Sequence, residues 1–339
     1  MSLLPPPRDS DPKSLILSSA EPDAVLASLL VARRAAFPLR RIYASEFDLR
    51  EALARPVVQR MEAGEVTVVG FAPAPGDAER LERFAADRPR VVLRMIDDHF
   101  RPPEDLSVLR RCLADAANGI DPSAPFLIRA ARWTNGDDAD VRRLVGLADG
   151  SLMPKEIARW GTTWTRILLA VSADPSRIRE ATDPLLHGRF EEPLDEYRAA
   201  GEGVEGLLND LARGPVHRFP FVGGDGVLIV APARPVWPFR ELAARVRRRT
   251  GAAFSLSCFD GEPAAFLGWG RGPLGGPISE TTKPPDAPAV AEVLRAAAPD
   301  RVLVRPMRRG EVLLDSIGGA FPPVVAELLT ILAQIPSIR

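Results

Sequence analysis

The most chemically suggestive stretch of the chain is "VVLRMIDDHF", which contains Asp97, Asp98 and His99 near its end. Six apolar or mixed residues come first and predict a buried strand, so the three polar side chains stand at its tip. Carboxylate and imidazole ligands together suit Mn, Fe or Zn. The alternative interpretation is that these residues cap the next helix or lie solvated in a loop. The chain has only three histidines, which favours a role for His99.

A second candidate is the stretch "ILSSAEPDAVLASLLVARRA", which predicts a strand, a polar turn and a helix. The turn carries Ser19, Glu21 and Asp23 at a spacing of two. Glu21 and Asp23 are positioned to bind a cation. Equally, Ser19 or Glu21 would cap the helix and complement its dipole.

A third acidic group lies in "WTNGDDAD", where Asp137 and Asp138 follow a glycine. In isolation these residues predict an exposed turn between helices with an N-cap. Two glycine-rich stretches follow, "GWGRGPLGGP" with Gly270 and Arg271, and "IGGAFPP" with Gly318 and Gly319. The first lies between predicted strands and so lacks the strand-turn-helix context of a dinucleotide or P-loop fingerprint, but its backbone amides with Arg271 are able to cradle a phosphate. The second precedes the last predicted helix, whose N-terminus is also able to receive an anion.

The elements that position these residues alternate over the first hundred positions. Strands are predicted at 14–19, 39–44, 66–72 and 90–96, with helices at 22–36, 47–63 and 76–87 between them. This order predicts a parallel, doubly wound α/β sheet, in which ligands bind at the carboxyl ends of the strands. Helical spacing follows at 104–117, 123–133, 139–149, 154–171 and 194–213.

The pattern changes near residue 214, where we predict a domain boundary between residues 1–213 and a smaller α/β domain at 214–339. In the second part we expect a hairpin around 223–226, helices at 236–249, 288–298 and 322–334, and strands near 253–259, 263–269 and 301–305. A glycine- and proline-rich loop separates them at 270–288, and a polar loop follows residue 305.

Composition excludes several classes of protein. The 339 residues are 46% hydrophobic and 26% charged, as expected of a globular protein with a sizeable core. The net charge of -1 provides no global field for nucleic acid. Cys112 and Cys258 make neither a disulfide framework nor a zinc site. No apolar run approaches the roughly 18 residues of a membrane helix, and we expect a cytoplasmic protein with the composition of a high-GC bacterium.

Taken in order, the motifs resemble those of the DHH phosphoesterase superfamily, which includes exonucleases, oligoribonucleases, cyclic-dinucleotide phosphodiesterases and exopolyphosphatases. "SAEPDAVLASLLVA" is similar to the family's first motif, "IDDHF" to its Asp-His-His motif, and "NGDDAD" to the region of its fourth. The resemblance covers nearly the whole chain and implies an N-terminal catalytic domain followed by a smaller substrate-binding domain.

The departures from that family affect its metal ligands. Ser19 stands in the place of the first motif His, Glu21 replaces its first Asp, and Gly70 replaces the Asp that bridges two metal ions. Asp98 replaces the first His of Asp-His-His, and the C-terminal Gly-Gly-Gly-His lacks its His. The resemblance therefore implies a degenerate centre, because a two-metal mechanism needs the bridge.

Two functions follow from this resemblance. The first is a catalytically silent or altered protein that binds a phosphate-bearing ligand (a nucleotide or short single-stranded nucleic acid) or a protein partner in the cleft between the domains. The alternative is an active metal-dependent phosphodiesterase or exonuclease with a single-metal or re-ligated site. There Asp23, Asp98 and Asp137, with Glu21 nearby, would hold Mn or Mg weakly. His99 and Asp97 would be catalytic, and Arg271 with Gly270, Gly318 and Gly319 would bind substrate.

Overall fold

The computed structural model describes two compact units, each with its own β-sheet. The described residues are 12–120, 130, 138–221, 224–231, 238–259, 264–269, 287–297, 302–308 and 311–316. The first unit holds the described residues up to 20 and from 24 to 130, and the second holds 21–23 and those from 138 onward. This division differs from the boundary near 214, which stays a prediction.

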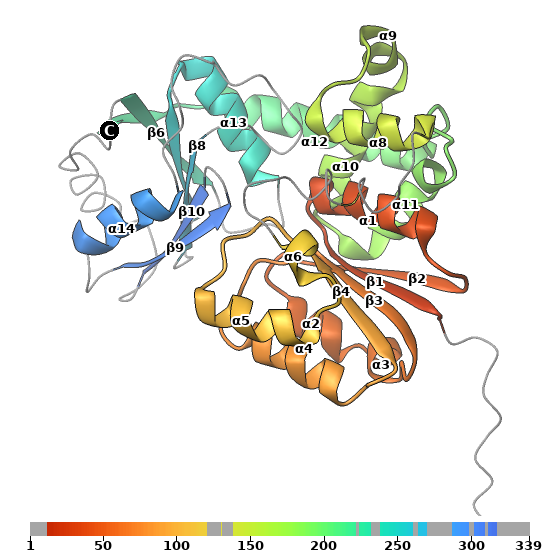
Figure 1. Cartoon of the computed structure of the whole chain (residues 1–339). Coiled ribbons are helices and arrows are strands. Elements are labelled where there is room, and N and C mark those ends of the chain that lie inside the picture. Colours follow the sequence, from red (N-terminus) through yellow and green to blue (C-terminus); the bar gives the residue numbers. More distant parts are fainter. Residues whose placement is uncertain are drawn as a thin grey trace, which may run out of the picture. The chain divides into compact units, whose positions relative to one another are not determined.

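The first unit is built on a parallel four-stranded sheet (Figure 1). Its strands pair in the order β2-β1-β3-β4, with bounds β1 Ser14–Ser19, β2 Leu39–Ala44, β3 Gly64–Val69 and β4 Val91–Ile96. Every residue of β1 is buried, as expected for a central strand covered on both faces. This confirms the predicted α/β class and places the carboxyl ends of all four strands at one edge.

Helices cover both faces of this sheet. α1 (Pro22–Arg34) lies on one face, and α2 (Leu49–Ala54), α4 (Asp77–Ala86) and α5 (Pro103–Cys112) lie on the other (Figure 1). Side chains of β1, α2, α4 and α5 form a single buried apolar cluster, represented by Leu17, Leu53, Leu81 and Leu109. This core holds the sheet in place, and the candidate polar residues follow the carboxyl ends of its strands.

The predicted helix at 47–63 is two shorter helices, α2 and α3 (Pro56–Gln59). Arg55 between them has φ -62° and ψ 137°, because the ring of Pro56 disfavours helical backbone at the residue before it. Similarly, the predicted helix at 104–117 ends at Cys112, and α6 (Ala116–Gly119) follows separately.

The second unit begins with a group of helices. Their bounds are α8 Ala139–Asp149, α9 Pro154–Glu156, a π-helical turn Ile157–Gly161, α10 Thr162–Val171, α11 Pro175–Leu186 and α12 Asp195–Arg213. The predicted helix at 154–171 thus contains a π-helical turn. Helix α11 was not expected, and Pro184 inside it weakened its pattern.

The second sheet has six strands in the order β5-β6-β7-β8-β10-β9. Among the strands that the structure describes in this sheet, only β6 and β7 pair in parallel. The bounds are β5 His217–Phe221, β6 Gly224–Ala231, β7 Phe254–Phe259, β8 Ala264–Trp269, β9 Val302–Arg308 and β10 Glu311–Ser316, with helices α13 Phe239–Thr250 and α14 Ala287–Ala297. The β5–β6 hairpin was predicted, whereas β10 was missed because it was interpreted as part of a polar loop.

A buried cluster from α10, α12, α13 and β6 forms a core of this unit, with Leu169, Leu208, Leu242 and Val227 among its members. Most of the predicted helix at 123–133, the glycine-rich loop up to 286 and the last helix at 322–334 lie outside the described residues. Among the described residues, no helix combines the length and the apolar character that crossing a membrane requires.

Candidate functional site

The candidate site lies at the carboxyl edge of the first sheet. Asp97 directly follows β4, and its backbone amide donates to Gly119 O at 2.9 Å. Glu46 follows β2 by two residues, and its carbonyl accepts the amide of Ala72 beyond β3 at 2.9 Å. The amide of Gly70 after β3 donates to Ile96 O at the end of β4 at 2.9 Å. These backbone bonds join the ends of β2, β3 and β4, so polar side chains from distant parts of the sequence meet there.

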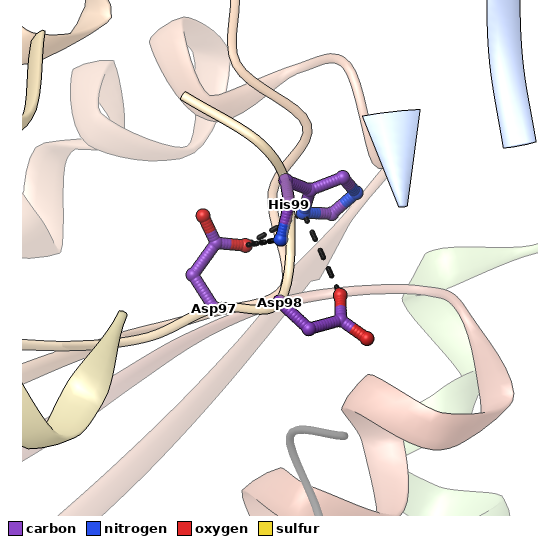
Figure 2. Close-up of side chains that lie close together, drawn as sticks. All are labelled: Asp97, Asp98 and His99. Carbon is purple, nitrogen blue, oxygen red and sulfur yellow. Dashed lines mark hydrogen bonds and ion pairs between the residues drawn. The ribbon is translucent and has the colours of Figure 1, made fainter. Parts of the chain in front are cut away.

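His99 lies between two buried carboxylates. Its Nδ1 is 2.6 Å from Asp97 Oδ1, and its Nε2 is 2.9 Å from Glu46 Oε1. The side chains of His99 and Asp97 are fully buried and that of Glu46 is 4% exposed. Figure 2 shows His99 linked to both Asp97 and Asp98, whose carboxylates approach the same ring nitrogen, Nδ1, at 2.6 and 4.0 Å. Both ring nitrogens of His99 are therefore engaged within the protein.

Arg101 holds the second oxygen of Asp97. Its Nε donates to Asp97 Oδ2 at 2.6 Å, and its Nη2 donates to the carbonyl of Phe71 at 2.9 Å. Burial by itself would raise the pKa of Asp97. The charges of Arg101 and His99 and their hydrogen bonds outweigh that effect and lower the pKa to about 2. Asp97 is therefore an ionised carboxylate, and each of its two oxygens is hydrogen-bonded to a side chain.

The charges of this network balance when His99 is doubly protonated. A neutral imidazole has one donor and one acceptor, so it donates to only one of two ionised carboxylates. The imidazolium donates to both Asp97 and Glu46. Two cations, His99 and Arg101, then face two anions in a site with little solvent, which is how buried charges are stabilised.

Asp98 is the more exposed acid of this motif and lies farther from His99 than Asp97 does. Its side chain is 18% exposed, and its Oδ1 lies 4.0 Å from His99 Nδ1. Asp97, Asp98 and His99 each offer a ligand atom within 4.8 Å of the others. A divalent ion on all three would have to displace the hydrogen bonds of Asp97 and His99, so the set fits a metal poorly as it stands.

Glu21, which was predicted as a metal ligand, forms an ion pair within the second unit. Its Oε2 lies 2.9 Å from Arg240 Nη1. The same guanidinium binds Glu311 through two further nitrogens, at 2.7 and 2.8 Å. Glu21 is thus held by an arginine, as Asp97 is, although its role as a metal ligand stays a prediction.

Asp23 and Ser19 of the predicted first motif lie close to the end of β1, and Gly70 follows β3. Asp23 lies in the first turn of α1, where a negative charge complements the helix dipole. Ser19, at the end of β1, is fully buried. Gly70, after β3, has φ +67°, a conformation that favours glycine, and it offers no side chain to a metal.

Several predicted site residues lie outside the described residues. These are Asp137, Gly270, Arg271, Gly318 and Gly319, whose roles stay predictions. The neighbouring Asp138 is the N-cap of α8, and its Oδ1 accepts the amide of Asp140 at 3.0 Å. His187 is exposed and its Nδ1 lies 2.8 Å from Asp183 O at the end of α11.

Sequence reasoning missed two members of the network, Glu46 and Arg101. A signal for Glu46 was present, because it follows a predicted strand and the carboxyl ends of parallel strands meet at one edge. Arg101 is two residues beyond His99 in the sequence, but nothing in the local pattern shows that its side chain turns back to Asp97.

Comparisons with known proteins identify the fold. No family model matches the sequence, and no curated protein matches it. The chain is similar in structure to a DHH domain from a member of a family of ribosomal proteins, at 15% identity and a TM-score of 0.61. That match covers 95% of this chain and 85% of the other. The chain therefore has the fold of a DHH-domain protein, as its motifs led us to expect.

Two weaker likenesses have TM-scores below 0.5. RecJ in complex with Mn²⁺ from Thermus thermophilus is matched at 14% identity and a TM-score of 0.48, over 97% of this chain and 53% of that one. CDC45 from Entamoeba histolytica is matched at 9% identity and a TM-score of 0.44, over 95% of both chains.

Proposed function

We propose that this chain is a degenerate DHH phosphoesterase-like protein with a catalytically silent centre. It acts by binding a phosphate-bearing ligand, a nucleotide or short single-stranded nucleic acid, or a protein partner. The observation that carries the proposal is the ion pair of Arg101 with Asp97. The arginine supplies, from within the chain, the positive charge that a metal ion would bring to this carboxylate.

The chemistry of Asp97 supports a silent centre. A divalent ion binds a carboxylate through its oxygen lone pairs, and both oxygens of Asp97 already accept hydrogen bonds at 2.6 Å. A guanidinium stays protonated at any pH at which proteins are folded, so it does not leave the site by losing its charge. A metal at Asp97 would face that charge directly.

Glu21 and Gly70 point the same way. The Glu21 carboxylate is paired with Arg240, which it shares with Glu311, and Gly70 has no side chain where the resemblance implies a bridging ligand. Without that bridge, two ions cannot be held a few ångströms apart to activate water and clamp a phosphate. The absence of this ligand supports the binding role that we propose.

A titration with Mn²⁺ tests the silent centre. The wild type, Asp98→Asn and a matched control, Asp48→Asn on an exposed loop residue, are titrated by calorimetry and assayed with bis(p-nitrophenyl) phosphate. We expect no saturable Mn²⁺ binding in the micromolar range for any of the three, and no Mn²⁺-dependent hydrolysis.

One observation favours the second candidate, an active single-metal phosphodiesterase or exonuclease. The ligand atoms of Asp97, Asp98 and His99 lie within 4.8 Å of one another. Micromolar Mn²⁺ binding that Asp98→Asn abolishes and Asp48→Asn retains, together with Mn²⁺-dependent hydrolysis, would establish this candidate and overturn the silent centre.

A further inference from the structure

A cavity of about 750 Å³ lies in the first unit at the amino ends of the strands. It is lined by Ser14 and Gly64, the first residues of β1 and β3, by Val92 near the start of β4, and by Val31 in the last turns of α1. This is the end of the sheet opposite to Asp97. Its volume is that of a small-molecule site.

The lining of this cavity has an excess of positive charge, although the whole chain carries a net charge of -1. Four cationic and two acidic side chains line it: Lys13, Arg34, Arg90, Arg94, Glu65 and Asp115. A local concentration of positive charge on a nearly neutral protein favours an anionic ligand.

The four cations of the cavity differ in whether they already form an ion pair. Arg94 Nε lies 3.3 Å from Glu65 Oε2, and Arg90 Nη2 lies 3.7 Å from Glu62 Oε2. By contrast, Lys13 and Arg34 form no ion pair with any acidic residue in the part of the chain that the structure describes. Both are exposed at the cavity, so an anion gains their charge without competing with a carboxylate.

The cavity also has an apolar side. Val31, Ala35, Ala36 and Val92 line it, and Val92 is 43% exposed. A nucleotide combines a charged phosphate with a flat, weakly polar base, and so matches a cavity with cationic and apolar sides. Inorganic phosphate would use the cations alone and leave the apolar side exposed to water.

We infer that this cavity binds a nucleotide, with Lys13 and Arg34 contacting its phosphates and Val92 contacting its base. The site deepens the binding role proposed above and rests on it, but requires neither a metal nor the Asp97–His99 network. The arginine provides planar donors to phosphate oxygens, and the lysine provides a point charge.

Calorimetry with ADP and with inorganic pyrophosphate tests this site on the full chain. The variants are Lys13→Ala with Arg34→Ala, Val92→Asp, and a control, Arg50→Ala, an exposed arginine on α2 that does not line the cavity. Circular dichroism checks the fold, because Arg34 also lies in the last turn of α1, where positive charge stabilises a helix.

We expect ADP to bind the wild type and Arg50→Ala equally. The double variant and Val92→Asp should each weaken ADP binding by about tenfold or more, and pyrophosphate should bind the wild type more weakly than ADP.

ADP binding unchanged in the folded double variant would overturn this site and leave the proposed binding role standing. Pyrophosphate binding as tight as that of ADP would overturn the nucleotide assignment. No binding of either probe to the wild type would overturn both this site and the nucleotide as the ligand proposed above, whereas the Mn²⁺ titration tests the silent centre separately.

Discussion

The Nε atom of Arg101 lies 2.6 Å from Asp97 Oδ2, and both side chains are completely buried. The two residues are four positions apart, on the loop that leaves β4. Their pairing completes a chain of contacts from Arg101 through Asp97 and His99 to Glu46. Each charge is stabilised by its neighbour, so removing one of these side chains should destabilise the others.

Loss of Arg101 should destabilise the first unit strongly. Arg101→Met leaves the Asp97 carboxylate buried without its main partner, which costs about 3 kcal/mol or more of unfolding free energy. Urea unfolding measures the change. The control is Arg111→Met, which removes an exposed pair with Glu82 at 2.9 Å and should cost less than about 1 kcal/mol. Equal, small losses in both variants would contradict a network that supports the fold.

Stability should fall with acid in a window set by Asp97. Its pKa is lowered from 3.8 to about 2. A lowered pKa adds stability that is present above pH 3.8 and disappears as the pH falls toward 2, about 2 kcal/mol in all. Urea unfolding of the wild type and Asp97→Asn between pH 6 and pH 2 measures it. Below pH 4 the free energy of unfolding should fall more steeply with pH in the wild type than in Asp97→Asn. Parallel plots of unfolding free energy against pH would show that Asp97 does not titrate in this way.

Glu46 and His99 should be energetically coupled, although they are 53 residues apart in the sequence. In a double-mutant cycle, Glu46→Gln and His99→Phe should deviate from additivity by about 1–3 kcal/mol, because either change removes the same ion pair. Glu46→Gln combined with Arg111→Met serves as the control and should be additive. An additive Glu46–His99 cycle would mean that the two side chains do not interact in solution.

The two cysteines should differ in reactivity toward a thiol reagent. Cys258 on β7 is 1% exposed, and burial raises its pKa to about 12. Cys112 at the end of α5 is partly exposed, and burial raises its pKa as well. Because the thiolate is the reactive form and needs access, the native protein should label slowly at Cys112 and not at Cys258. The Cys112→Ser variant should label only after denaturation, and rapid labelling of that variant would show that β7 is accessible.

Local patterns were sufficient to predict the first sheet. Alternating buried strands and helices predicted β1 to β4 within a few residues, since a strand covered on both faces must be apolar along its length. The same patterns failed at Arg55, where one proline divided a helix, and at β10, whose charged ends "EVLLDS" resembled a loop. Strand formation there depends on pairing with β8 and β9, which lies outside a local window.

The sequence by itself therefore determined that Asp97, Asp98 and His99 stand at a strand tip, because their position after a buried strand is a local property of the chain. Only the tertiary structure decided which partners they have. Glu46 comes from the loop after β2 and Phe71 from the loop after β3, and Arg101 turns back toward β4. A hydrogen bond of 2.6 Å depends on the packing of all these loops at once, and that packing is set by contacts between residues far apart in the chain.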